Sequence, residues 1–291
     1  VQVLVHGFTL SPGYFDPPYR LERYSYVQAA NAAGYATLNL SRLGVADSDD
    51  PPATEVTTGT HAYTLHQVLD AVRAGVLGGV PAPKVVLVGH SYGTEIAALA
   101  AARFGGADAV VAAGFLHPGF DVPEATLFIG SSLPAQLDPA FASSGLPAGY
   151  VTTLPGYRHR FYQPGNVEPA VVAMDEATKQ TGTYGEVFTF GEYFQPGSVA
   201  GVSVPVLVVT GAHDPFFCNP TLSCAGPGAI IERERDWFRA APCLEAFVQA
   251  GAGHNISLEL NNRDGWAAQL DFVDRHVGPS GVPSRPGGCA G

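Results

Sequence analysis

Residues 85–105 read VVLVGHSYGTEIAALAAARFG, in which an apolar run leads directly into Gly-His-Ser-Tyr-Gly and an alanine-rich helical pattern follows. The pattern predicts a strand over 85–88, a sharp turn, and a helix over 94–104. Such a turn strains its central residue and leaves no space for side chains at the two glycines. It would hold the hydroxyl of Ser91 clear of a sheet at the amino end of a helix, where the helix dipole favours developing negative charge. Ser91 is therefore a candidate nucleophile, and the alternative is a structural serine in a tight turn.

Apolar, β-branched runs alternate with helical patterns along most of the chain. The expected strands cover residues 1–5, 36–40, 85–88, 109–115, 204–210 and 245–250. The expected helices cover residues 24–34, 65–77 and 94–104. Strands that are apolar throughout and alternate with helices indicate an α/β protein with a mostly parallel central sheet and helices on both faces. The chain of 291 residues is long enough to form such a fold around one sizeable core.

The alternating pattern breaks between residues 120 and 200, where Gly, Pro, Ser and aromatic residues are frequent. The aromatic residues of this stretch include Phe128, Phe141, Tyr150, Tyr157, Phe161, Tyr162, Tyr184, Phe188, Phe190, Tyr193 and Phe194. A polar linker would not need so many, so we expect a cap or lid whose aromatic side chains pack on the core and line a pocket. The predicted α/β core then consists of residues 1–119 and 201–291, and the cap of residues 120–200. A purely structural insertion is the alternative.

A nucleophilic serine needs a base and a carboxylate that orients the base. The apolar run 206–209 leads into Thr-Gly-Ala-His-Asp, which places Asp214 just after a buried strand. Asp214 is the expected acid and Asp121 the reserve, and an aspartate that merely caps a turn is the alternative. His254 is the expected base, because it follows the run 245–250 in a glycine-rich loop and completes the order serine, acid, histidine.

Such a site also needs backbone N–H donors for an oxyanion. Tyr92, which follows the candidate nucleophile, would supply one donor. The loop after the first strand, His-Gly-Phe-Thr, would supply the other, with Phe8 as the first choice and Thr9 as the second. Gly7 would let this backbone come close to a substrate oxygen. Histidines interpreted as structural or pocket-lining are His6, His90 and His213, whereas His117 and His276 lack a partner in the expected order.

Together these motifs resemble the α/β-hydrolase fold of serine hydrolases, in the esterase and lipase-like branch that carries an inserted cap. The resemblance rests on His6-Gly7-Phe8, Gly89-His90-Ser91-Tyr92-Gly93, Gly211-Ala212-His213-Asp214 and Gly253-His254, and it covers nearly the whole chain except the cap. Ser41-Arg42-Leu43-Gly44 is similar to the family's Asp-Arg-x-Gly loop, with Ser41 in place of the aspartate. The chain also resembles secreted fungal members. In the family, two or so strands normally precede the strand in which this sequence opens.

The resemblance implies a serine hydrolase that cleaves a carboxylic ester or lactone with an apolar group through an acyl-enzyme. Ser91, His254 and Asp214 would form its triad, and Phe8 and Tyr92 its oxyanion hole. Serine at position 91 argues against epoxide hydrolases and dehalogenases, which place an aspartate there. The alternatives are a thioesterase, a cofactor-free haloperoxidase, or a receptor-like protein that uses the pocket for ligand binding. No cofactor or metal is expected, because the sequence shows no metal-ligand spacing and no phosphate-binding loop.

The composition narrows the expected partners. A net charge of −11 argues against nucleic acid, because phosphate binding needs a basic surface. No apolar run reaches the roughly 18 residues of a membrane span. The expected partner is a small apolar ester or lactone, and the oligomeric state stays open.

Four cysteines, Cys218, Cys224, Cys243 and Cys289, allow three disulfide pairings. The favoured pairs are Cys218–Cys224, which would close a short loop, and Cys243–Cys289, which would tie down the tail. Four free thiols are the alternative. An even number of cysteines, few lysines, and many glycines and prolines favour a secreted protein. We therefore expect an extracellular, mature chain that lacks its signal peptide.

Overall fold

A parallel sheet forms the centre of the protein. The structure is a computed structural model and describes residues 1–283 and 289. Within these residues the main sheet has the strand order β2-β1-β3-β4-β8-β9, with every neighbouring pair parallel. Its strands are β1 (Gln2–Val5), β2 (Thr37–Leu40), β3 (Val86–His90), β4 (Ala109–Ala113), β8 (Val206–Gly211) and β9 (Leu244–Gln249). The predicted fold class is therefore confirmed, and each expected strand is present to within two residues at either end.

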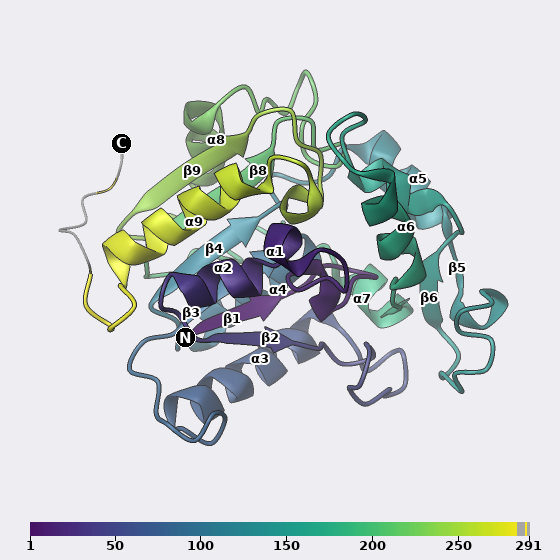
Figure 1. Ribbon diagram of the computed structural model, residues 1–291, viewed down its shortest axis with the longest axis horizontal. Helices are drawn as coiled ribbons and strands as arrows, with labels where there is room; N and C mark the ends of the chain where they lie inside the picture. The colour runs from purple at the N-terminus through teal and green to yellow at the C-terminus, as the bar shows by residue number, and fades with distance from the viewer. Residues whose placement is uncertain (284–288, 290–291) are drawn as a thin grey trace.

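Helices cover both faces of this sheet (Figure 1). On the face toward the viewer lie α2 (Tyr26–Ala32) and α9 (Asn262–His276), which pack against each other. On the opposite face α3 (Thr58–Arg73) packs on α4 (Tyr92–Phe104), and α4 packs directly on β1, β3 and β4. The central strands are consequently buried on both sides, which explains why β3 and β4 are apolar along their whole length.

Side-chain caps decide where two of the predicted helices begin. The pattern predicts a helix over 65–77, but Thr57 accepts a hydrogen bond from the N–H of Thr60 and starts α3 at Thr58. Likewise Ser25 accepts from the N–H of Gln28 and starts α2 at Tyr26, separating it from the short α1 (Leu21–Tyr24). The expected helix over 24–34 is thus shorter than predicted.

Several elements were not predicted from the sequence. They include α8 (Pro227–Glu234), which packs on β9, the helix α9, and a small antiparallel sheet of β5 (Ser132–Pro134), β6 (Tyr150–Thr153) and β7 (Gly182–Thr183). Short 3₁₀ helices cover Pro12–Tyr14, Ala135–Leu137, Tyr157–Phe161 and Ile256–Leu258.

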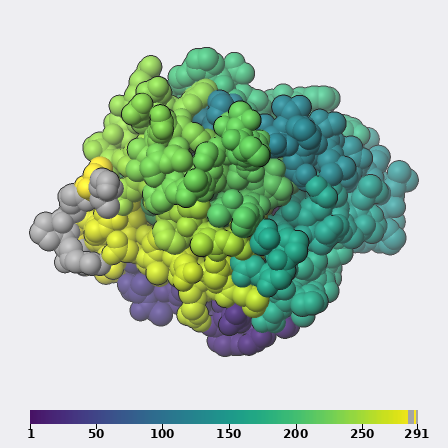
Figure 2. Space-filling view, turned by 90° about the horizontal axis from the view of Figure 1, so that it is seen from above, coloured from purple at the N-terminus to yellow at the C-terminus, as the bar shows by residue number. Residues whose placement is uncertain are grey.

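The stretch between β4 and β8 contains the small sheet together with α5 (Val122–Gly130), α6 (Pro169–Ala177) and α7 (Tyr184–Thr189). We call residues 120–200 the inserted segment. In Figure 1 it is teal and lies beyond the carboxyl ends of the central strands. Figure 2 shows it as one side of the molecule, next to the green residues around α8. This position puts the inserted segment over the edge of the sheet at which loops from neighbouring parallel strands meet.

Two disulfides are present, and both have the predicted pairing. Cys218–Cys224 closes the loop that follows β8, and Cys243–Cys289 joins the start of β9 to the C-terminal tail. Among the described helices, none combines the length and the apolar character needed to cross a bilayer.

The contact between α4 and β1 predicts a sharp effect at Gly93. A methyl group at this position would lie 1.9 Å from the carbonyl oxygen of Val5, so Gly93→Ala must push the helix off the strand. We expect a loss of about 3 kcal/mol or more in the free energy of unfolding, measured by urea denaturation. Gly130→Ala is the matched control, because a methyl there meets no described atom within 4 Å. Equal stability of the two variants would contradict the close approach.

Candidate active site

Ser91 lies between β3 and α4 in a backbone conformation that few residues adopt. Its φ is 54° and its ψ is −129°, a region that costs free energy for any residue with a Cβ atom. The N–H of Ser91 donates to the carbonyl of Ala113 at 2.7 Å and anchors the turn to β4. A methyl at Gly89 would lie 2.5 Å from the Cα of Thr94. The glycines of the motif are therefore required by the backbone packing around the turn.

The structure brings His254 and Asp214 together with Ser91. The Nε2 of His254 lies 2.9 Å from the Oγ of Ser91, and its Nδ1 lies 2.8 Å from Oδ2 of Asp214. Asp214 is completely buried, and its Oδ1 accepts the N–H of Phe216 at 2.9 Å. With the Nδ1 proton donated to the carboxylate, the Nε2 lone pair faces the serine hydroxyl. This arrangement can remove the hydroxyl proton as the oxygen attacks an electrophile.

The reserve acid, Asp121, lies elsewhere. One of its oxygens accepts the N–H of Glu124 at the start of α5, and the other accepts from the side chain of Asn219. It is an N-cap, which is the ordinary role of an aspartate before a helix.

His90 holds the backbone of the candidate base. Its Nε2 donates to the carbonyl of His254 at 3.0 Å, and its ring stacks on Tyr14 at a centroid distance of 3.9 Å. Burial, with a smaller contribution from His254, lowers the pKa of His90 well below its usual range. His90 is consequently a neutral donor, and its structural interpretation agrees with these contacts. His117 is buried against Glu234, and within the described residues His213 forms no hydrogen bond to Ser91.

The loop after β1 runs directly beside Ser91. A methyl at Gly7 would lie 2.8 Å from the Cβ of Ser91, so only glycine permits this approach. In the described chain the backbone N–H groups of Phe8 and Tyr92 have no hydrogen-bond acceptor. Thr9 has a positive φ of 55°, and its hydroxyl donates to the carbonyl of Phe8 at 2.7 Å. Two free donors thus flank the serine, on residues that also line a cavity.

This cavity has a volume of about 120 Å³ and contains Ser91 and His254 in its wall. Its apolar lining residues are Phe8, Leu10, Tyr92, Phe115, Phe120, Ala125, Phe128, Ile129, Phe161, Val187, Phe190, Phe216 and Phe217, and Asn255 adds a polar side chain. The expectation that aromatic residues of the inserted segment line a pocket holds for Phe128, Phe161 and Phe190. It is wrong for Phe188 and Tyr184, which are 82% and 44% exposed and do not line the cavity.

Buried polar groups of the inserted segment contact the loops of the site. Arg158, which is completely buried, donates to Asp175 at 2.6 Å and to the hydroxyl of Thr9 at 2.9 Å. The carbonyl of Phe161 accepts the N–H groups of His254 and Asn255. The inserted segment is therefore attached by hydrogen bonds both to the loop after β1 and to the loop of the candidate base.

Glu259 is a further residue of the site that sequence reasoning did not find. Its Oε1 accepts the N–H of Gly253 at 2.9 Å and that of Gln163 at 2.7 Å, and its Oε2 accepts from Asn166. It therefore ties the residue before His254 to the inserted segment. The only signal in the sequence is a carboxylate five residues after the histidine, and nothing local indicates that it is buried.

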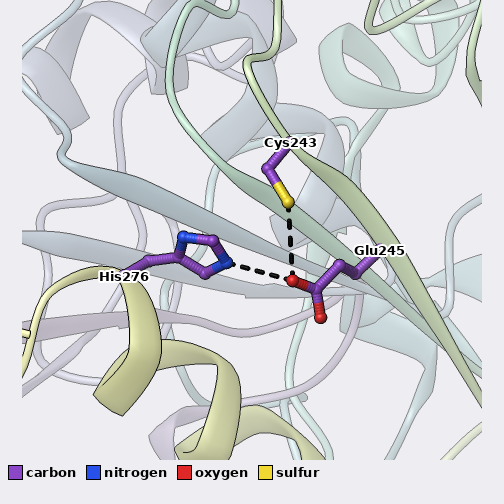
Figure 3. Close-up of side chains that lie close together, drawn as sticks. All are labelled: Cys243, Glu245 and His276. Atoms are coloured by element: carbon purple, nitrogen blue, oxygen red, sulfur yellow. Dashed lines mark hydrogen bonds and ion pairs between the residues drawn. The ribbon is translucent and has the colours of Figure 1, made fainter. Parts of the chain in front are cut away.

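One cluster of potential metal ligands occurs in the described residues, away from Ser91. Figure 3 shows Cys243 and His276 pointing toward the carboxylate of Glu245, which lies 3.0 Å from Nε2 of the histidine. The sulfur of Cys243 is bonded to Cys289 and has no thiolate to offer a metal. Both oxygens of Glu245 accept from Arg275 at 2.6 and 2.7 Å. The cluster is an ion-pair network that joins β9 to α9.

A parallel α/β sheet with a serine held at positive φ between strand and helix, and an imidazole at hydrogen-bonding distance, is the arrangement of an α/β hydrolase. The chain matches the alpha/beta hydrolase family over residues 2–269 and belongs to that family. No curated protein is significantly similar to it in sequence.

Solved structures with the same fold include a methylesterase from Arabidopsis, with a TM-score of 0.61 and 15% identity over 94% of this chain and 98% of the other. A bromoperoxidase from Bacillus anthracis has a TM-score of 0.66 and 20% identity over 94% and 91% of the two chains. A carboxylesterase from Bacillus subtilis has a TM-score of 0.60 and 17% identity over 94% and 82%. At these identities the similarity establishes the fold.

The burial of Glu259 makes the free energy of unfolding depend on pH. Burial is the main cause that raises the pKa of its carboxyl from 4.5 to about 7, so the folded state binds a proton that the unfolded state has released. This contribution to stability is complete below about pH 4.5 and is lost as the pH rises through about 7, with a magnitude of about 3 kcal/mol at most. We expect Glu259→Gln to flatten the fall of the unfolding free energy between pH 4.5 and 7.5 in urea titrations. The exposed control Glu232→Gln should keep the wild-type slope, and an unchanged slope in Glu259→Gln would contradict the assignment.

Proposed function

We propose that the protein is a serine hydrolase that cleaves a carboxylic ester or lactone with an apolar group through an acyl-enzyme. The observation that carries this proposal is the chain of contacts from Ser91 through His254 to Asp214, with distances of 2.9 and 2.8 Å, in the wall of an aromatic cavity. Esterases among the proteins of the same fold agree with this chemistry.

The reaction would proceed in two halves. The Oγ of Ser91 attacks the ester carbonyl while its proton passes to Nε2 of His254. The tetrahedral intermediate then expels the alcohol, which takes the proton from the imidazolium, and leaves an acyl group on Ser91. Water attacks this acyl-enzyme by the same route in reverse, with His254 again as the base. Asp214, buried and bonded to Nδ1, keeps the imidazole in the required tautomer and stabilises its charged form.

The N–H groups of Phe8 and Tyr92 would bind the oxyanion of each tetrahedral intermediate. Support comes from their position on either side of Ser91 and from the absence of any other acceptor for them in the described chain. Such donors are effective because they are already oriented before charge develops. Loss of one of them typically costs about 3 kcal/mol of transition-state stabilisation.

The cavity supports an uncharged, apolar substrate. Its wall is formed almost entirely by aromatic and aliphatic side chains, which gain free energy by excluding water from an apolar acyl or alcohol group. The net charge of −11 would repel anionic substrates at long range. Within this proposal residues 1–119 and 201–291 form the catalytic core, and residues 120–200 act as a cap that closes the pocket. The two disulfides are compatible with secretion.

Labelling with an activity-based probe tests whether Ser91 is the nucleophile. A fluorophosphonate probe should label the wild-type protein, and Ser91→Ala should lose both labelling and ester hydrolysis while keeping the wild-type melting temperature. Labelling is read by mass spectrometry of the modified peptide. Ser144→Ala, an exposed serine of the inserted segment, is the matched control and should label fully. A folded wild-type protein that the probe does not modify would favour the ligand-binding alternative.

Enlarging the cavity tests whether it binds the acyl group of the substrate. Phe128 belongs to the surface helix α5 and packs edge-on to Phe8 at a centroid distance of 6.0 Å. Phe128→Ala should enlarge the cavity and raise kcat/KM for longer p-nitrophenyl esters relative to the acetate by about 10-fold or more, since each added methylene is worth about 1–3 kcal/mol in an apolar pocket. Hydrolysis rates of lactones, measured in the same assay, show whether the enzyme prefers open-chain esters or lactones. An unchanged chain-length profile would place the acyl group elsewhere.

A further inference from the structure

The peptide group between Gly7 and Phe8 is held at its oxygen by two donors. Arg42 donates through Nη2 to the carbonyl of Gly7 at 3.1 Å, and Nδ1 of His6 donates to the same oxygen at 3.0 Å. This peptide is planar and trans, so its N–H, which belongs to Phe8, points away from the carbonyl. Two donors on the oxygen therefore fix the direction of the N–H on the other side.

The protonation of His6 agrees with this role. Burial, followed by the charge of Arg42, lowers the pKa of His6 well below its usual range, so the ring is neutral. Its Nε2 accepts the backbone N–H of Arg42 at 3.4 Å, which leaves the proton on Nδ1 for the carbonyl of Gly7. His6 thus connects the backbone of Arg42 to the same peptide group that the guanidinium contacts.

Arg42 also contacts the residue that carries the second free donor. Its guanidinium carbon lies 5.1 Å from the ring centroid of Tyr92, the residue after Ser91. The arginine side chain is only 1% exposed, and it does not line the cavity that contains Ser91. Arg42 therefore affects the site through the residues that it contacts, the Gly7–Phe8 peptide and Tyr92.

The inserted segment supplies the counter-charge that keeps Arg42 in place. Glu186 of α7 accepts from Nη1 of Arg42, and Nε2 of His61 lies 2.9 Å from the same carboxylate oxygen. Burial opposes ionisation of Glu186, but Arg42 and His61 outweigh it and lower the pKa of the carboxyl below its usual value. Glu186 is itself fixed by a capping box with Thr183. The guanidinium of Arg42 is consequently paired with a buried carboxylate that is itself held by hydrogen bonds to Thr183.

We propose that Arg42 is a positioning residue that orients and polarises the Gly7–Phe8 peptide so that the Phe8 N–H serves as an oxyanion donor. A cationic donor on the carbonyl draws electron density from the amide and strengthens its N–H as a donor at the other end. The inference rests on the proposed hydrolase function. The motif Ser41-Arg42-Leu43-Gly44 contains no group that touches the substrate. Its arginine would instead polarise the peptide that carries an oxyanion donor.

Two variants of the ion pair test the proposal. Arg42→Lys keeps the charge facing Glu186, but a single ammonium cannot reproduce the forked contact with both the carboxylate and the carbonyl of Gly7. The double variant Arg42→Gln with Glu186→Gln removes both charges together and leaves no unpaired buried ion. The matched control is Arg103→Gln, which removes a half-exposed arginine that also pairs with a glutamate of the inserted segment, Glu192. Thermal melting verifies folding of each variant.

Kinetics with a p-nitrophenyl ester separate positioning from substrate binding. We expect kcat to fall by between about 10-fold and 100-fold in both ion-pair variants, with KM within about 3-fold of wild type, since an oxyanion donor acts on the transition state. Inhibition by a trifluoromethyl ketone, which forms a tetrahedral adduct with the serine, should weaken by the same factor as kcat. Arg103→Gln should match wild type in all three quantities. A folded ion-pair variant with wild-type kcat would overturn the proposal.

A spectroscopic readout decides the inference even without turnover. Labelling with ¹³C′-glycine and ¹⁵N-phenylalanine selects the three Gly–Phe pairs of the chain, 7–8, 114–115 and 119–120. The Phe8 amide proton should move upfield in Arg42→Lys while the other two resonances stay in place, and an unmoved Phe8 signal would refute the polarisation.

The kinetic results also distinguish the two hypotheses. A wild-type protein without Ser91-dependent hydrolysis would refute the hydrolase function. A wild-type protein with full activity whose Arg42 variants are unaffected would refute only the role of Arg42.

Discussion

The close packing of backbone around Ser91 is the constraint on which the rest of the site depends. The serine occupies a region of φ and ψ that costs free energy, and it stays there because neighbouring chain segments leave no alternative. Gly93 lies against β1, and Gly7 lies against the serine itself. Each of these contacts excludes even a methyl group. The same packing brings the loop that contains Gly7 and Phe8 against the serine side chain.

Much of this arrangement could be predicted from the sequence, because it depends on local patterns. The run from strand through Gly-His-Ser-Tyr-Gly to helix identifies Ser91, and the parallel sheet brings the ends of β8 and β9 to the same edge. Asp214 and His254 follow those strands directly, so their meeting with Ser91 is a consequence of topology. The helices α8 and α9 were missed although they are ordinary elements. The N-caps Thr57 and Ser25 shifted the boundaries of two others, because capping by a single side chain outweighs apolar spacing at helix ends.

The residues that support the site were harder to predict, for a physical reason. Arg42, Arg158 and Glu259 are polar side chains that are buried, and their partners lie far away in the sequence. Arg42 finds Glu186 across 144 positions, and Arg158 finds Thr9 across 149. Propensity and periodicity carry no information about such pairs. Only the folded chain shows that these charges are desolvated together and that their hydrogen bonds end on the loops around Ser91.

The ties between the inserted segment and the core have a consequence for how this fold can change. Glu186 balances Arg42, a cation that the core keeps buried, whereas Arg158 and its partner Asp175 both belong to the segment and reach the loop after β1 through Thr9. Shortening or exchanging residues 120–200 would strand a desolvated positive charge in the core unless the replacement brought a carboxylate to the same place. Swapping this segment between related proteins is therefore a problem of charge balance first and of pocket shape second.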